Sequence, residues 1–131
     1  MWPLCIKLRG DIVFNLRFIF NPGSCGYFCL KYILKQKIVK QSYISLCKMK
    51  EVISSNGYYC SCLRLKNVTD IKTGCLSLIE TKNNGKHYIV VKMIKKGKIY
   101  YYDPLFLLVR KKKIEYFIRK WSGICLFYTK V

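Results

Sequence analysis

The sequence predicts a protein of the α+β class, in which helices come first and antiparallel strands follow. Two segments, 25–35 and 42–55, have the composition and end signals of helices. From residue 58 onward, short segments rich in Ile, Val, Leu and Tyr alternate with turns. Helical segments followed by a run of strands are typical of helices packed on an antiparallel sheet.

The two helices have clear boundaries in the sequence. The turn at 21–24 ends in Ser24, a residue type suited to cap a helix, so the first helix is expected to begin at Cys25. Asn56 and Gly57 are expected to end the second helix, because both tolerate the left-handed backbone that follows many helices.

The strands are placed by the apolar segments between turns. We expect strands at 58–65, 74–80, 87–93, 99–103 and 123–128, a loop at 67–73 with room for one helical turn, and a short helix at 112–120. Residues 95–98 read as the hairpin turn between the third and fourth strands. Pro104 ends the fourth strand, since proline cannot donate to a sheet ladder.

Size and charge limit the classes of function. At 131 residues, the chain is expected to form one domain, at 21–131, preceded by an arm at 1–20 of uncertain role. There are 25 Lys and Arg against 6 Asp and Glu, a net charge of +19. This excess suits an acidic partner such as nucleic acid, a membrane surface or an acidic peptide, but it also fits a lysine-rich composition without any binding role. No nucleic-acid-binding motif accompanies the charge.

The first twenty residues are apolar but interrupted by charges. Leu4, Leu8, Ile12 and Leu16 recur at helix spacing, which fits either an amphipathic helix on a membrane surface or a segment packed on the core. We favour packing. No apolar run has the length of a membrane span.

The eight cysteines do not follow a disulfide or zinc pattern. Their spacing is irregular, and Cys60, Cys62 and Cys75 are placed too unevenly for the usual zinc ligands. We interpret most of them as small buried hydrophobic residues in a reducing compartment, and we expect no metal and no cofactor.

Three residues carry a pattern suited to thiol chemistry. Cys25 is expected at a helix start, where unpaired N–H groups and the helix dipole lower a thiol pKa. His87 is the chain's only histidine, and as a base its imidazolium would lower that pKa further. Asp103 would hold the imidazole in the required tautomer. Since the turn at 95–98 separates His87 from Asp103, both are expected on adjacent strands with a shared face.

Each of these residues also has an ordinary interpretation. Cys25 alone fits an inert core cysteine, His87 alone fits a buried polar side chain, and Asp103 before proline fits a turn. The three together, in this order and on these elements, favour nucleophilic catalysis. Gly26 would leave room for a substrate backbone beside the nucleophile.

The motifs around these residues resemble those of the C39 peptidases, papain-like enzymes that remove double-glycine leaders. The matching segments are 24–26, 86–91, 102–104 and 121–123, and the resemblance extends over 21–131. It implies a papain-like fold with Cys25 as the nucleophile, His87 as the base and Asp103 as the orienting residue. It also implies a precursor peptide with a Gly-Gly-type leader as substrate, an ABC exporter as partner and a link to bacteriocin-like export.

The resemblance further implies an oxyanion hole, made by the backbone N–H of Cys25 and a glutamine side chain. This chain has Ile19 in place of that glutamine, and Ser24 where the family has aspartate. Asn21 is the nearest amide, and we assign it the second donor role. We assign Gly26 and Tyr88 to substrate binding. Loss of one oxyanion donor typically lowers turnover by on the order of 10²–10³.

Three functions stay open from the sequence. The first is a cysteine endopeptidase, the second is a weakened C39-like domain that binds a leader or docks on an exporter, and the third is a small basic nucleic-acid-binding protein. We favour the first, and expect a cytoplasmic monomer without a nucleic-acid partner, held at the inner membrane face through a transporter. Without an ATP-binding motif or a membrane span, the chain is expected to be a stand-alone or truncated version of the family's domain.

Overall fold

The computed structural model describes residues 5–8, 12–15, 24–36, 38, 43–71, 74–82 and 85–131, of which the first two ranges are described by their backbone alone. The elements are β1 Cys5–Leu8, β2 Ile12–Asn15, α2 Cys25–Leu34, α3 Leu46–Ser55, β3 Tyr58–Arg64, η2 Val68–Asp70, β4 Cys75–Thr81, β5 Gly85–Lys95, β6 Lys98–Asp103, β7 Leu108–Lys113, α4 Ile114–Phe117 and β8 Trp121–Lys130.

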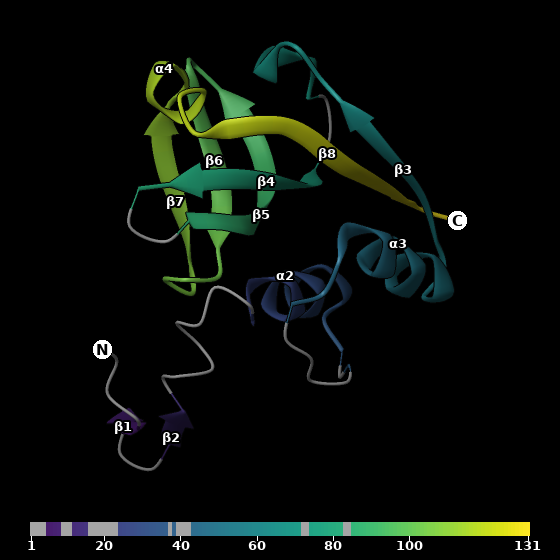
Figure 1. Cartoon of the computed structure of the whole chain (residues 1–131), viewed down its shortest axis with the longest axis vertical. Helices are drawn as coiled ribbons and strands as arrows, with labels where there is room; N and C mark the ends of the chain where they lie inside the picture. Colours follow the sequence, from purple (N-terminus) through teal and green to yellow (C-terminus); the bar gives the residue numbers. More distant parts are fainter. Residues whose placement is uncertain are drawn as a thin grey trace.

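Six of these strands form one antiparallel sheet. Its order is β3-β8-β4-β5-β6-β7, and every neighbouring pair is antiparallel. In Figure 1 the sheet is strongly curved, α2 and α3 lie together beneath it, and α4 lies near its far end. The predicted α+β class, with helices packed on an antiparallel sheet, is therefore confirmed.

The two helices follow the predicted boundaries with one difference. α2 begins at Cys25 and ends where Lys35 takes a left-handed φ of 55° and donates its N–H to the Lys31 carbonyl. α3 begins at Leu46, four positions later than the start expected at 42. The Ser45 hydroxyl accepts the Lys48 N–H at the helix start, and Tyr43 has a φ of 55°, which a right-handed helix cannot include.

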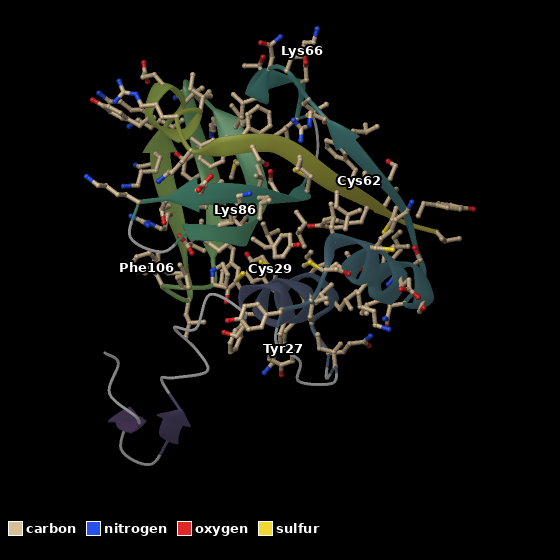
Figure 2. All side chains as sticks on the ribbon, viewed as in Figure 1. Tyr27, Cys29, Cys62, Lys66, Lys86 and Phe106 are labelled. Carbon is tan, nitrogen blue, oxygen red and sulfur yellow. The ribbon has the colours of Figure 1, made fainter. Side chains whose placement is uncertain are left out.

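The sheet has an apolar core on each face. One core lies between the sheet and the helices, and the other lies on the opposite face, where Phe117 of α4 covers it. Figure 2 shows Cys29 of α2 pointing toward the sheet, and both Cys29 and Tyr27 belong to the core on the helix side. Side chains of β5 alternate between the cores: Tyr88 and Val90 face the helices, whereas Ile89 and Val91 face the other core.

The prediction of a helix at 112–120 is wrong except for one turn. Leu108–Lys113 instead forms the edge strand β7, which pairs with β6 from Lys98↔Lys113 to Asp103↔Leu108. The helix α4 is limited to Ile114–Phe117. The apolar spacing at 114–118 resembles a helix face, but pairing with a preformed strand satisfies the backbone of the preceding residues and overrides that local preference.

The final strand begins at Trp121, two residues earlier than expected. Its indole N–H donates to the Ser77 hydroxyl at 2.9 Å, which fixes the start of β8 against β4. The hairpin turn at 95–98 is confirmed: Lys96 and Gly97 have φ values of 51° and 74°, as a two-residue turn between twisted strands requires.

The N-terminal segment is extended where the structure describes it. β1 and β2 pair as an antiparallel hairpin from Cys5↔Asn15 to Leu8↔Ile12, so the amphipathic-helix interpretation of this segment is wrong at these positions. The packing of its side chains on the core stays a prediction.

The described ranges show how the cysteines are buried, whether a helix could cross a membrane and whether metal ligands gather. No disulfide joins the cysteines between 25 and 125, and Cys29, Cys75 and Cys125 are fully buried, whereas Cys47 and Cys62 are exposed. Within these ranges no helix is long and apolar enough to cross a membrane. No cluster of His, Cys, Asp or Glu suited to hold a metal occurs in them either.

Candidate functional site

The thiol of Cys25 lies where the start of α2 meets the start of β5. Cys25 is the first residue of α2 and is 5% exposed. Its Sγ accepts a hydrogen bond from the Tyr88 backbone N–H at 3.2 Å. Since Tyr88 directly follows His87 in β5, this bond fixes the thiol beside the backbone that carries the imidazole.

The imidazole of His87 is buried against a carboxylate. His87 is 1% exposed, and its Nε2 lies 3.5 Å from Oδ1 of Asp103. Neither ring nitrogen makes a regular hydrogen bond within the described part of the chain. With Nε2 directed toward Asp103, Nδ1 is the ring nitrogen that faces away from this carboxylate.

The position of Asp103 agrees with the predicted hairpin geometry. β5 and β6 pair at Val91↔Tyr101, and strand residues that oppose each other share a face. Counting by twos from this pair places His87 and Asp103 on that same face. The prediction that they lie on adjacent strands, on one side of the sheet, is therefore confirmed.

Asp103 is held as a buried carboxylate. Its Oδ1 accepts the Leu105 N–H at 3.1 Å, and its Oδ2 lies 3.5 Å from Nη1 of Arg110. Burial alone would raise the pKa of Asp103, but His87, the Leu105 N–H and Arg110 together hold this pKa below its usual value. The carboxylate is therefore ionised at neutral pH and can stabilise a positive charge on the imidazole.

The pKa of the Cys25 thiol is raised, whereas the sequence led us to expect a lowered value. Burial raises this pKa, and the negative charge of Asp103 adds to the effect. Hydrogen bonds from the backbone N–H groups of Tyr88 and Gly26 lower it but do not outweigh burial. The helix start supplies the expected N–H groups, yet desolvation dominates, so the resting site holds a neutral thiol.

A pocket opens beside the thiol. Its volume is about 290 Å³, and it is lined by Cys25, Gly26, Tyr43, Ile44, Leu78, Lys86, His87 and Tyr88. The wall is mostly apolar, and among its described residues Lys86, which Figure 2 labels on β5, is the ordinarily charged one. The pocket brings together Cys25, His87 and both residues assigned to substrate binding.

The missing side chain at Gly26 matters for close packing as well as for the access of a substrate backbone. A Cβ at this position would lie 3.3 Å from Cβ of Ile44 and 3.6 Å from Cδ2 of Tyr88. The first distance is shorter than ordinary van der Waals contact, so any side chain would push against the segment that precedes α3. Gly26 thus lets the start of α2 approach the pocket wall.

Several residues of the site were not foreseen from the sequence. Tyr43, Ile44 and Leu78 line the pocket but come from a loop and from β4, and no local motif distinguishes them. Arg110 contacts Asp103 from β7, a strand that the sequence did not predict. Asn21, assigned to the oxyanion hole, lies outside the described residues, as does Ile19.

A second pocket adjoins the first and is strongly basic. It has a volume of about 440 Å³ and shares Leu78 and Lys86 with the first pocket. Its further charged lining residues are Arg64, Glu80, Arg119 and Lys120. A peptide that leaves the thiol along this side would therefore meet more positive than negative charge.

Comparison with known protein families gives a match over most of the chain. Residues 19–131 match the sequence model described as the Peptidase C39 family. No curated protein sequence matches the chain significantly.

Solved structures share the fold. The peptidase domain of Streptococcus mutans ComA matches with a TM-score of 0.65 and 18% identity over 81% of this chain and 91% of that domain. The peptidase domain of Streptococcus ComA, described as a bifunctional ABC transporter of a quorum-sensing pathway, matches with a TM-score of 0.67 and 16% identity. This match covers 83% of this chain and 93% of that domain. A double-glycine-motif protease from an AMS/PCAT transporter, solved with the leader peptide, matches with a TM-score of 0.65 and 21% identity. This match covers 82% of this chain and 85% of that one. The fold is thus that of papain-like peptidase domains.

Proposed function

Since this chain belongs to the peptidase C39 family, we propose that it is a cysteine endopeptidase that removes the leader of a precursor peptide after a Gly-Gly-type pair. The observation that carries the proposal is the pocket lined by both Cys25 and His87, with Asp103 3.5 Å from the imidazole. A structural relative solved with a leader peptide supports this substrate class.

The proposed reaction begins with the thiol of Cys25 in its neutral form. The Cys25 thiol transfers its proton to Nδ1 of His87 as Sγ attacks the scissile carbonyl carbon. The ionised Asp103 stabilises the imidazolium that forms. Because the resting pKa of Cys25 is raised by burial, this transfer is expected when the peptide is bound and not before.

The remaining steps restore the enzyme. The imidazolium of His87 gives its proton to the leaving amine, and the leader stays on Cys25 as a thioester. A water molecule, deprotonated by His87, then attacks the thioester carbonyl, and the leaving sulfur recovers the proton. We assign stabilisation of the oxyanion to the Cys25 backbone N–H and to Asn21.

The narrow pocket supports small residues before the cut. Gly26, Ile44, Leu78 and Tyr88 all line it, and even a single Cβ added at Gly26 would lie 3.3 Å from Cβ of Ile44. We assign Gly26 and Tyr88 to the contact with the peptide backbone. A Gly-Gly or Gly-Ala pair would pass these walls, whereas a bulky side chain would need them to move apart.

The basic second pocket supports recognition of acidic residues in the substrate. Lys86 belongs to both pockets, and Arg64, Arg119 and Lys120 extend the positive surface away from the thiol. We propose that acidic side chains of the peptide lie here. We also propose that the protein acts as a cytoplasmic monomer in association with an exporter, in a process linked to peptide export.

A non-catalytic role is the second candidate. The raised pKa of Cys25 and the presence of Ile19 in place of the family glutamine both favour a domain that binds a leader without cutting it. Incubation with a synthetic precursor peptide that contains a Gly-Gly pair separates the two. The enzyme cuts it after the pair, whereas a binding domain retains it whole.

Variants connect any cleavage to the site. Cys25→Ala and His87→Ala should abolish product detected by mass spectrometry. Cys29→Ala is the matched control, because Cys29 lies on the same helix but is fully buried in the core. Cleavage that survives Cys25→Ala would rule out the proposal.

A further inference from the structure

The turn between β6 and β7 presents an unusual group of apolar side chains to solvent. Phe106, Leu107, Leu108 and Val109 are consecutive and are 49%, 42%, 50% and 44% exposed. Figure 2 labels Phe106 at this turn, on the outside of the sheet. We call residues 106–109 the apolar tip. Consecutive large apolar residues left in water are uncommon unless a partner covers them.

Basic residues follow the apolar tip directly. The tip continues along β7 into Arg110, Lys111, Lys112 and Lys113. Asp103 is the one acidic residue in the range 103–113, and it is buried, so it presents no negative surface. The pKa of Lys120 is lowered by burial and by repulsion from Arg110 and Lys112, which shows that positive charges crowd this edge of the sheet.

Protection of a sheet edge does not account for this arrangement. Edge strands commonly carry lysines that prevent pairing with other chains, and Lys111 and Lys113 fit that role. The same purpose would place charges at positions 108 and 109 as well. Instead, Leu108 and Val109 make the first half of the edge strand apolar.

The two faces of the strand are exposed together. Neighbouring residues of a strand point to opposite faces, so the exposure of both Leu108 and Val109 means that neither face is covered there. A peptide docked on one face of the hairpin would leave the other face in water. A lipid phase that surrounds the tip would cover both.

The backbone at the tip is also strained. Leu107 has a φ of 53°, a left-handed conformation that glycine or asparagine adopts at far lower energy. Lys35 and Lys96 take the same conformation at a helix end and a hairpin turn, whereas the residue here is a large apolar one. Here the conformation holds a leucine outward at the point of the turn.

From these observations, we propose that the apolar tip inserts into the surface of an anionic phospholipid bilayer, with the following cations bound to the lipid phosphates. Two to three strand residues span roughly 7–10 Å, which is the depth at which interfacial segments bury their apolar side chains. The basic half of β7 then lies at the level of the headgroups. This inference is independent of the proposed cleavage reaction.

Such docking would place the site close to the membrane. Arg110 lies with its guanidinium carbon 4.5 Å from the Phe106 ring centre, and its Nη1 lies 3.5 Å from Oδ2 of Asp103. The tip is therefore joined to the site by one side chain.

The test is co-flotation of the full chain with vesicles of equimolar phosphatidylcholine and phosphatidylglycerol. The variant Leu107→Asn/Leu108→Thr/Val109→Thr keeps the net charge, suits the left-handed turn and suits the strand. It should lower vesicle affinity by at least roughly tenfold. The matched control is Leu63→Thr, a leucine 50% exposed on the opposite edge strand, which should leave affinity unchanged.

A pair of charge variants tests the basic half separately. Lys111→Gln/Lys113→Gln should lower affinity by roughly thirtyfold, since each cation near an anionic surface contributes about fivefold. Lys48→Gln/Lys50→Gln removes the same charge from exposed positions of α3 and should have little effect. Circular dichroism melting shows which variants remain folded. If the triple variant unfolds, the proposal is decided by comparing the vesicle affinities of the two double lysine variants.

Three results would overturn the proposal. One is wild-type affinity in the folded triple variant. Another is an equal loss of vesicle affinity in Lys48→Gln/Lys50→Gln on α3 and in Lys111→Gln/Lys113→Gln on β7. That result would mean that the whole basic surface attracts the vesicles diffusely. The third is stronger binding to soluble polyglutamate than to the vesicles, with competition between them, which would identify the partner as an acidic peptide.

Discussion

The charge on Asp103 is the feature of the site whose effect can be worked out most directly. The variant Asp103→Asn keeps the shape of the side chain and an oxygen that can accept the Leu105 N–H, so the turn after β6 is preserved. What it removes is the negative charge beside His87. It also leaves Arg110, whose Nη1 lies 3.5 Å from Oδ2 of Asp103, without a counter-charge.

The expected loss follows from the distance between the charges. The imidazolium that forms during the proposed reaction lies 3.5 Å from the carboxylate. With an effective dielectric constant of about 20, two unit charges at this distance attract by about 5 kcal/mol. Since about 1.4 kcal/mol corresponds to a tenfold change in rate, kcat/KM should fall by roughly three to four thousandfold.

The assay is cleavage of a synthetic precursor peptide, followed by mass spectrometry over time. Asp70→Asn is the matched control, because it makes the same chemical change at an exposed position of η2. It should leave kcat/KM unaltered. A kcat/KM of Asp103→Asn close to that of the wild type would refute the reasoning, since Asp103 would then not stabilise the imidazolium.

Three further predictions concern stability, packing and recognition. Since the folded pKa of Asp103 is held below its ordinary value of 3.8, its charge stabilises the fold above that pH, and the contribution is lost as pH falls through the lower folded value. Urea unfolding should therefore separate wild type from Asp103→Asn more at neutral pH than at strongly acidic pH; an equal difference at both would contradict this. Gly26→Ala should lower the free energy of unfolding by about 1–3 kcal/mol, because the added Cβ presses on Ile44. The same variant should weaken cleavage of the peptide. An unchanged urea midpoint would show that Ile44 moves aside at no cost in stability. Binding of an acidic leader, followed by fluorescence anisotropy, should weaken as salt rises and weaken further in Lys86→Gln/Arg119→Gln; salt-insensitive binding would assign recognition to apolar contacts instead.

Local chain signals were sufficient for the helix start and for the hairpin that carries the site. Ser24 precedes α2 at the expected position, although its side chain makes no capping hydrogen bond, and the turn at Lys96 and Gly97 sets the register that brings His87 and Asp103 to one face. These features depend on a few neighbouring residues, so a sequence pattern is enough to place them.

Features that depend on distant parts of the chain were not predictable in this way. β7 forms because β6 offers an unpaired edge, and no property of residues 108–113 alone indicates this. The pKa of Cys25 depends on how deeply packing from other elements buries it, and that burial outweighs the helix start. The residues Ile44 and Leu78 of the pocket wall are ordinary apolar residues in their local sequence.

The most direct test is to trap the nucleophile with a leader peptide that ends in Gly-Gly chloromethyl ketone, followed by peptide mapping. The account predicts one adduct, on Cys25, that forms slowly or not at all in His87→Ala. The exposed thiols of Cys47 and Cys62 should stay unlabelled at the same reagent concentration. Labelling that favours those exposed cysteines, or that is the same with and without His87, would contradict it.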